Sequence, residues 1–184
     1  MNRWWIYNVL FGIGYTLMLP KFLYRMWRRG GYRRGFLQRL GRYDAEALRA
    51  LGDPGRIWVH GVSVGEVQVA LRFIDAARRA GESRRFLVTT TTSTGFAVAR
   101  RVLEERAPLL YFPTDFPPVV RRVLDTLQPS MLVLTESEFW PNLIRECGRR
   151  GIPVVLINGR ISEEAFRGYR LLRGFFREIW AAFT

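Results

Sequence analysis

The stretch His60-Gly61-Val62-Ser63-Val64-Gly65-Glu66 decides the fold class that the sequence predicts. An apolar run at residues 57–59 precedes it, and apolar residues at helical spacing follow it as far as residue 80. This order indicates a buried strand, a turn that contains glycine, and a helix with an acid in its first turn. Because ligands of open α/β sheets bind where strands end and helices begin, Glu66 is the leading candidate for a catalytic residue.

The same alternation of strand and helix continues along the chain. Short apolar runs predict strands at residues 57–62, 86–90, 109–112, 131–134 and 154–157. Amphipathic patterns predict helices at residues 66–80, 95–105, 118–127, 141–150 and 162–180, the last with Ser162 as its cap. Strands that are apolar on both faces are typical of a parallel sheet between two layers of helices. We therefore expect an α/β fold with a Rossmann-like parallel sheet.

The N-terminal segment is almost free of charge from Trp4 to Leu19, and aromatic residues stand toward both of its ends. A bilayer span needs about 20 apolar residues, so this segment fits a helix that crosses the membrane or lies in its interface. Arginines at residues 25–34 favour a cytoplasmic location for the rest of the chain. The alternative is an amphipathic helix packed on the domain. We expect a hydrophobic helix with a basic flank (1–30), a loop-like connector (31–55) and a Rossmann-like domain (56–184).

Composition narrows the classes of function. The 184 residues, 48% of them hydrophobic, suffice for one domain with a core, and the lone cysteine, Cys147, excludes a disulfide within the chain. The net charge of +13 favours an anionic partner or a membrane surface, although a GC-rich genome alone would explain the preference for arginine over lysine. A nucleic-acid binder is disfavoured because the sequence has no RNP motif and no recognition-helix pattern.

Polar residues cluster where each predicted strand ends, and parallel strands bring such ends to one edge of a sheet. Glu136 and Glu138 flank one serine after the fourth strand, and residues two apart on an extended chain point the same way. We assign a functional role to Glu136 and a helix-capping role to Glu138. The candidates for substrate contacts are Ser63, Gly65, Thr92, Ser93, Thr94, Gly95, Asn158 and Arg160, with Arg39 from the connector.

Helix capping is the competing interpretation for several polar residues. Ser93, Thr94 and Asp115 are each placed to cap a following helix, whereas hydroxyl and N–H groups at a helix start also hold phosphates. His60, the only histidine, is equally consistent with a structural role and with a place beside the candidate base. The sequence has no metal-ligand spacing and no glycine motif for nucleotides, so we expect no metal and no cofactor.

Five ordered motifs together resemble the 3-deoxy-D-manno-octulosonic acid (Kdo) transferases of lipopolysaccharide synthesis. The resemblance extends from the hydrophobic start to the end of the chain, and Gly61, Ser137 and Gly159 depart from the usual residues. The motifs are WVHGVSVGE (58–66), TTTTSTG (89–95), YFPTDFP (111–117), ESEFWPNLI (136–144) and NGRIS (158–162).

This resemblance implies the N-terminal, acceptor-binding domain of a GT-B glycosyltransferase without its C-terminal donor domain. It implies a lipid A precursor as acceptor, CMP-Kdo as a donor held mainly by the second domain, no nucleic acid, and the cytoplasmic face of the inner membrane of a Gram-negative bacterium. The residues that match the family's catalytic base and second essential acid are Glu66 and Glu136. Attack by a hydroxyl that a single base deprotonates inverts the anomeric carbon. A helix start stabilises the charge of a carboxylate and weakens it as a base, whereas burial acts in the opposite direction.

Two other functions remain open at this point. One is another membrane-associated GT-B transferase that acts on a lipid-linked sugar. The other is an acceptor-binding fragment without activity of its own. No strand pattern follows the final predicted helix, so we expect a chain that is cut inside a larger protein and is inactive alone.

Overall fold

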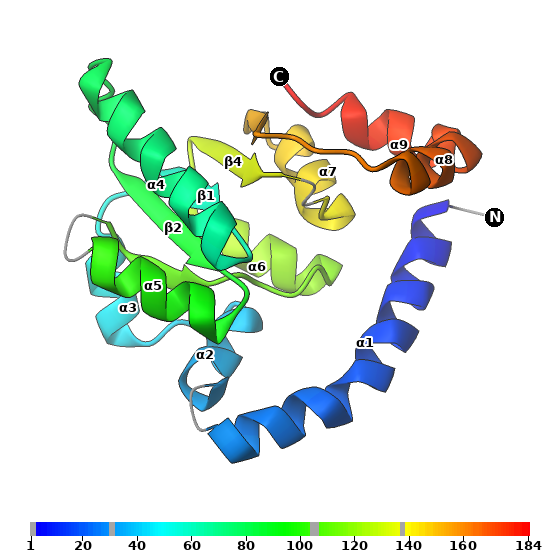
Figure 1. The fold of residues 1–184 in the computed structure, drawn as a ribbon, viewed down its shortest axis with the longest axis horizontal. Helices are drawn as coiled ribbons and strands as arrows, with labels where there is room; N and C mark the ends of the chain where they lie inside the picture. Colours follow the sequence, from blue (N-terminus) through cyan, green and yellow to red (C-terminus); the bar gives the residue numbers. More distant parts are fainter. Residues whose placement is uncertain (1–2, 30–31, 104–106, 137–138) are drawn as a thin grey trace.

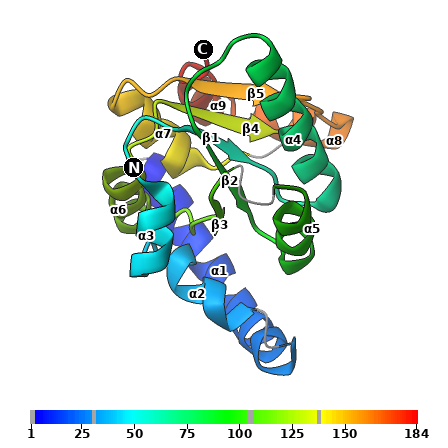
Figure 2. The ribbon, with the colours of Figure 1, turned by 90° about the vertical axis from the view of Figure 1, so that its left-hand side faces the viewer.

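The computed structural model describes residues 3–29, 32–103, 107–136 and 139–184, apart from the side chains of residues 25, 26, 28, 29 and 32–34. The strands form one parallel sheet in the order β3-β2-β1-β4-β5 (Figure 1 and Figure 2). This is a doubly wound sheet, and its order reverses between β1 and β4. The predicted Rossmann-like sheet is therefore confirmed. The strands are β1 (Ile57–His60), β2 (Phe86–Thr90), β3 (Leu109–Tyr111), β4 (Met131–Thr135) and β5 (Val154–Ile157).

Helices cover both faces of this sheet (Figure 2). On one face, α4 (Val64–Arg79) and α5 (Ser93–Leu103) enclose a cluster that includes Val59 and Val88. On the other face, α3 (Ala45–Leu51), α6 (Pro117–Leu127) and α7 (Pro141–Arg149) cover Trp58 and Leu132. Every residue of β1 and β2 is buried as a result, which explains why these strands read as continuous apolar runs.

Some element boundaries differ from the prediction. β1 ends at His60 and β3 at Tyr111, earlier than expected, whereas Thr135 extends β4. Beyond β1, the Val62 carbonyl accepts hydrogen bonds from threonine side chains. Helices α4 to α7 begin and end within one or two residues of their predicted limits, as is usual where helix ends fray.

The segment predicted as a connector is helical over much of its length, so the loop-like conformation expected for it is corrected. It contains α2 (Tyr32–Arg39) and α3. Asp44 caps α3 by accepting a hydrogen bond from the Ala47 N–H at 2.8 Å, and α3 buries Ala47 and Leu51. α3 is helical for two reasons. Asp44 caps a run of residues with high helix propensity, and the apolar side of that helix is buried against the domain.

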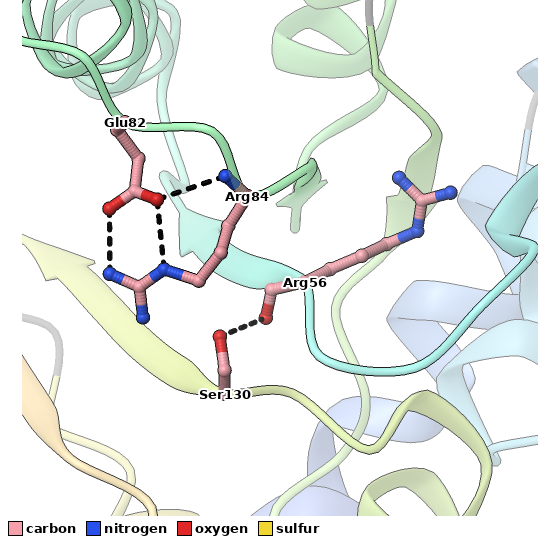
Figure 3. A network of polar contacts seen from close by, with 4 residues as sticks. All are labelled: Arg56, Glu82, Arg84 and Ser130. Atoms are coloured by element: carbon pink, nitrogen blue, oxygen red, sulfur yellow. Dashed lines mark hydrogen bonds and ion pairs between the residues drawn. The ribbon is translucent and has the colours of Figure 1, made fainter.

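Arg56 anchors the amino end of the sheet, away from the candidate site. Its buried guanidinium donates to the carbonyls of Ala50 and Leu51, at the end of α3, and to that of Phe86 in β2. Its own carbonyl accepts hydrogen bonds from the N–H and the hydroxyl of Ser130 at 2.9 and 3.4 Å (Figure 3). A cation at a helix C-terminus is stabilising, so this contact fixes α3 on the strands.

The final predicted helix, 162–180, is two helices in the structure. Ser162 caps α8 (Glu163–Leu171) as predicted, because its Oγ accepts from the Ala165 N–H at 3.1 Å. The backbone leaves the helical path at Leu172, and α9 (Arg173–Trp180) follows. This break lets α9 bury Ile179 in the core, whereas no residue of α8 is buried.

The N-terminal helix α1 (Arg3–Arg29) runs beside the domain, from the neighbourhood of α9 toward α2 (Figure 1). Trp4 Nε1 donates to Glu178 at 2.7 Å, and the hydroxyl of Tyr7 donates to Asp115 at 2.8 Å. By length and composition, Arg3–Tyr24 is also a candidate membrane span. One side of α1 is thus docked on the domain while the other side stays apolar and open. We call that side the exposed apolar face of α1; it includes Trp5, Leu10, Ile13, Leu17 and Trp27.

Candidate active site

The loops after β1 and β4 flank the point where the strand order reverses, and crevices at such points hold ligands in open α/β sheets. Ser63 caps α4, and its Oγ accepts from the Glu66 N–H at 3.3 Å while the Glu66 carboxylate accepts from the Ser63 N–H at 3.2 Å. This reciprocal capping box fixes the direction of the Glu66 side chain. Gly61 lies against the same turn, and a Cβ there would be 2.9 Å from the Glu66 carbonyl carbon, so glycine permits this close approach.

The Glu66 carboxylate accepts hydrogen bonds on both of its oxygens. Oε2 accepts from the Val62 N–H at 3.0 Å and lies 3.2 Å from Thr135 Oγ1, while Oε1 takes the contact with Ser63. Only 7% of the residue is exposed. A carboxylate offers about four lone-pair sites, so roughly one is left for a further donor such as a substrate hydroxyl.

Glu136 and Asn158 follow β4 and β5 in the left-handed backbone region, with φ of 57° and 52°. This conformation is unfavourable for glutamate, and backbone strain of this kind is concentrated at functional sites. Asn158 Nδ2 lies 3.5 Å from Glu136 Oε1, and the Glu136 N–H donates to the Ile157 carbonyl at 2.9 Å. The structure therefore places Glu136 directly after Thr135, at the same edge as Glu66. Ser137 and Glu138, and the capping role predicted for Glu138, lie outside the described residues.

The threonine run at the end of β2 supports the turn that precedes Glu66. The hydroxyls of Thr90 and Thr92 donate to the Val62 carbonyl at 3.1 and 2.8 Å. The N–H of Val62 in turn donates to Glu66 Oε2. Two of the threonines thus support the candidate base through the backbone of one loop residue.

The same run starts α5, but the cap is not the predicted one. Thr92 Oγ1 accepts from the Gly95 N–H at 3.0 Å, so Thr92 is the capping residue. Ser93 and Thr94 lie inside the first turn of α5, and the capping role predicted for them is wrong. A Cβ on Gly95 would come within 2.6 Å of Thr90 Oγ1, so the glycine allows the helix to start this close to β2.

Asp115 caps a helix, but not the one directly after it in the chain. Phe116 precedes α6 without any capping hydrogen bond from its side chain. The Asp115 carboxylate instead accepts from the N–H groups of Asn142 and Leu143, at the start of α7, both at 2.9 Å, and from the hydroxyl of Tyr7. Burial raises the pKa of Asp115 to about 7 against the opposing effect of these donors. The prediction of a cap was right in kind and wrong in partner, because tertiary packing brings α7 to this carboxylate.

Arg39 reaches the carboxyl edge of the sheet from the end of α2. Its Nη2 donates to the Thr91 carbonyl at 2.6 Å, and its guanidinium carbon lies 4.5 Å from the centre of the Tyr111 ring. The residue is buried, although the sequence placed it only in a connector. The remaining predicted contacts, Ser63, Gly65, Asn158 and Arg160, are exposed or half-buried after β1 and β5, where a ligand can reach them.

His60 is fully buried at the end of β1. Its Nδ1 lies 3.1 Å from the Thr89 carbonyl oxygen, and its ring stacks on Phe112 with the centroids 3.6 Å apart. Burial lowers the pKa of His60 to about 3, so the ring is neutral near pH 7. A neutral ring inside a stack of aromatic side chains favours the structural interpretation of this histidine over a role beside the base.

Sequence reasoning missed Thr135, the residue that joins the two strands at the reversal point. Its Oγ1 lies 2.9 Å from the His60 carbonyl and 3.2 Å from Glu66 Oε2. The available signal was a hydroxyl side chain at the end of an apolar strand and directly before Glu136. Within the described ranges, no group of three or more His, Cys, Asp or Glu side chains is arranged to hold a metal ion.

Comparison with known proteins gives one consistent result. A family model described as 3-Deoxy-D-manno-octulosonic-acid transferase (kdotransferase) matches residues 34–184. A 3-deoxy-D-manno-octulosonic acid transferase of Chlamydia pneumoniae is 32% identical over 168 residues, which cover 91% of this chain and 38% of that protein. A protein of the same name from Bordetella pertussis is 35% identical over 167 residues, covering 83% of this chain and 38% of that protein.

A more distant kind of relative also matches. A bifunctional glycosyltransferase/methyltransferase of Fusobacterium nucleatum is 29% identical over 174 residues, covering 91% of this chain and 25% of that protein. The chain spans about two fifths of the length of the Chlamydia and Bordetella proteins.

Proposed function

Because the chain belongs to the 3-deoxy-D-manno-octulosonic-acid transferase family, we propose that it is the acceptor-binding half of an inverting glycosyltransferase. In this proposal the enzyme transfers Kdo from CMP-Kdo to a lipid A precursor. The relatives extend well beyond the region that matches this chain, and we assign most of the donor contacts to that further region. We also propose that residues 1–184 alone do not transfer Kdo.

The observation that carries the proposal is the Glu66 carboxylate at the reversal point of the sheet, held by hydrogen bonds on both oxygens and with about one acceptor position open. An acceptor hydroxyl at that position gives its proton to Glu66 as its oxygen attacks the anomeric carbon of Kdo. The bond to the CMP phosphate breaks on the opposite side, which inverts the anomeric centre. The phosphate leaves as a stable anion, so no general acid is needed at this half of the site.

The remaining features are assigned to holding the acceptor. Glu136, strained at the end of β4, is proposed as the second acid that positions the reacting sugar. The net charge of +13 suits a phosphorylated acceptor and an anionic membrane surface. The exposed apolar face of α1 is proposed to lie in the membrane interface, at the cytoplasmic face of the inner membrane.

The test is Glu66→Gln in the protein extended by its native sequence beyond residue 184. Glutamine also satisfies a capping box, so the fold of α4 should persist while the base is lost. We expect Kdo transfer to fall by about 10²–10⁴-fold, measured as CMP release with a lipid A precursor. Near-normal turnover with an unchanged melting temperature would refute Glu66 as the base.

Glu82→Gln is the matched control. Glu82 pairs with Arg84 at the surface (Figure 3). It lies between the end of α4 and the start of β2, at the amino end of the sheet, whereas the proposed site is at the carboxyl end. This variant should transfer Kdo at the rate of the unmodified protein.

Retention of the anomeric configuration in the product, read by NMR, would exclude the single-displacement mechanism even if the enzyme is active.

A further inference from the structure

A cavity of about 390 Å³ lies between α1 and the carboxyl edge of the sheet. Its size is within the range of about 300–1,000 Å³ that is usual for small-molecule sites. Phe11, Tyr15 and Leu19 line it from α1, and Phe112 and Trp140 line it from the domain. The walls are therefore mostly apolar, although the cavity adjoins an edge of the sheet where the other loops are polar.

Two of the residues that line these walls each have a buried polar atom with no hydrogen-bond partner among the described residues. The atoms are Thr91 Oγ1 and Trp140 Nε1. Buried polar groups are nearly always hydrogen-bonded, so such atoms in residues of one cavity wall indicate a missing partner. An indole N–H can only donate, and a hydroxyl can also donate, so the partner must carry an acceptor oxygen.

The same cavity carries positive charge. Arg39 and Lys21 both line it, Arg39 from the buried end of α2 and Lys21 from the exposed part of α1 beside Pro20. Within this apolar lining, two cations select for a ligand that is apolar over most of its length and anionic at one end.

The cavity also communicates with the exposed side of α1. Met18 lines the cavity and is nevertheless 60% exposed, and its neighbour Leu17 belongs to the exposed apolar face of α1. The apolar lining of the cavity therefore reaches the exposed side of α1 at Met18.

We propose that this cavity holds one acyl chain of the lipid acceptor. The chain fills the apolar volume, its carbonyl oxygen accepts hydrogen bonds from Thr91 and Trp140, and an adjacent phosphate lies beside Arg39 and Lys21. This proposal rests on the proposed function for the identity of the lipid. The proposal also connects the bound acyl chain to the candidate base. Thr92, next to Thr91, donates to the Val62 carbonyl, and the Val62 N–H donates to Glu66.

The first test measures binding to the 184-residue chain and does not depend on transfer. Dodecyl phosphate, below its micelle concentration, is titrated by calorimetry. We expect one molecule per chain, and at least tenfold weaker binding to Leu19→Trp, which fills the cavity. Leu48→Trp, at an exposed site on α3, is the matched control and should bind normally. Equal binding to Leu19→Trp and Leu48→Trp, with both variants folded by circular dichroism, would overturn the proposal.

The charge at the cavity is tested by changing the head group. Dodecyl maltoside has the same chain without the anion and should bind more weakly than dodecyl phosphate. Lys21→Met, which leaves the core untouched, should reduce this preference at least threefold. Equal affinity for the two probes in the unmodified chain would remove the phosphate from the proposal.

The second test separates this inference from the proposed function. In the extended protein, Leu19→Trp should raise the KM for an acylated lipid A precursor at least tenfold and leave kcat unchanged. The KM for the deacylated acceptor should not change. If no Kdo transfer is found at all but dodecyl phosphate binds with the expected stoichiometry, the proposed function fails and the cavity site stands. If transfer is normal and Leu19→Trp leaves both KM values unchanged, the cavity site fails alone.

Discussion

Thr135 Oγ1 lies 3.2 Å from Glu66 Oε2, and this contact joins the end of β4 to the first turn of α4 across the reversal point of the sheet. The same hydroxyl lies 2.9 Å from the carbonyl of His60, the last residue of β1. One buried side chain therefore holds the candidate base in register with both central strands. The position of Glu66 depends on this tertiary contact as well as on its own capping box.

Thr135→Val should preserve the shape of this side chain and remove its hydroxyl. The hydroxyl has one proton, so the buried His60 carbonyl or Glu66 Oε2 then loses its donor, and we expect the free energy of unfolding to fall by about 1–3 kcal/mol. Thr126→Val, at an exposed site on α6, is the control and should change it by about 0.5 kcal/mol or less. Urea unfolding measures both, and equal effects of the two substitutions would show that the Thr135 contact has no special weight.

The backbone strain at Glu136 can be measured by comparing the stabilities of two substitutions that both remove the carboxylate. Because its φ is 57°, Glu136→Gly should be more stable than Glu136→Ala by about 1 kcal/mol. At Gln68, an exposed helical position in α4, the order should reverse, and alanine should be the more stable by about 1 kcal/mol. Thermal unfolding of the four variants decides the matter, and the same order at both positions would contradict left-handed strain at Glu136.

Asp115 should make stability fall as pH rises. Burial raises its pKa from 3.8 to about 7, so the folded state holds a proton that the unfolded state has lost between these values. Its contribution is complete below about pH 4 and disappears as pH rises through 7, at about 1.4 kcal/mol per pH unit. Asp115→Asn cannot titrate, so the difference in unfolding free energy between the unmodified protein and this variant should shrink from pH 4 to pH 8. A difference that stays constant over this range would mean that Asp115 is ionised throughout.

His60 should have the opposite effect on stability. Its pKa is lowered from 6.5 to about 3, so below pH 6.5 the unfolded state binds a proton that the folded state does not bind. Its contribution is complete above pH 6.5 and is lost as pH falls toward 3, again at about 1.4 kcal/mol per unit. Because the chain has one histidine, its ring signals in an NMR titration are unambiguous and should not move between pH 5 and 8. A midpoint near pH 6.5 in the folded protein would show that the ring is accessible to water.

The exposed apolar face of α1 should govern membrane contact. Leu10 and Leu17 are 62% and 75% exposed, and burying one leucine contributes about 1.5–3 kcal/mol. The double variant with Leu10→Glu and Leu17→Glu should bind vesicles of anionic phospholipid at least tenfold more weakly in co-sedimentation. Leu48→Glu, exposed on α3, serves as the control and should bind as the unmodified chain does. Unchanged sedimentation of the double variant would remove α1 from the proposed membrane surface.

The helices and strands of this protein follow from local patterns in its sequence. The apolar runs of β1 to β5 needed cover on two faces, and that requirement alone implied a parallel sheet between helices. The sequence predicts the cap Ser162 and the first turns of α4 and α8, because a cap and its helix are neighbours in the chain. The resemblance to the family is visible in the sequence for a similar reason, because the family's motifs are short and lie at the ends of these elements.

Contacts between residues that are distant in the chain depend on how the elements pack together. Asp115 caps α7 instead of α6, Thr135 contacts Glu66, and Arg39 of the supposed connector donates to Thr91. Tertiary packing also determines how α1 docks on the domain to form the cavity, and where the final helix breaks at Leu172. The physical reason is that periodicity and capping report the backbone within a few residues, whereas these contacts depend on how strands and helices are stacked. That stacking is fixed by the packing of whole side-chain layers, and residue spacing along the chain does not encode it.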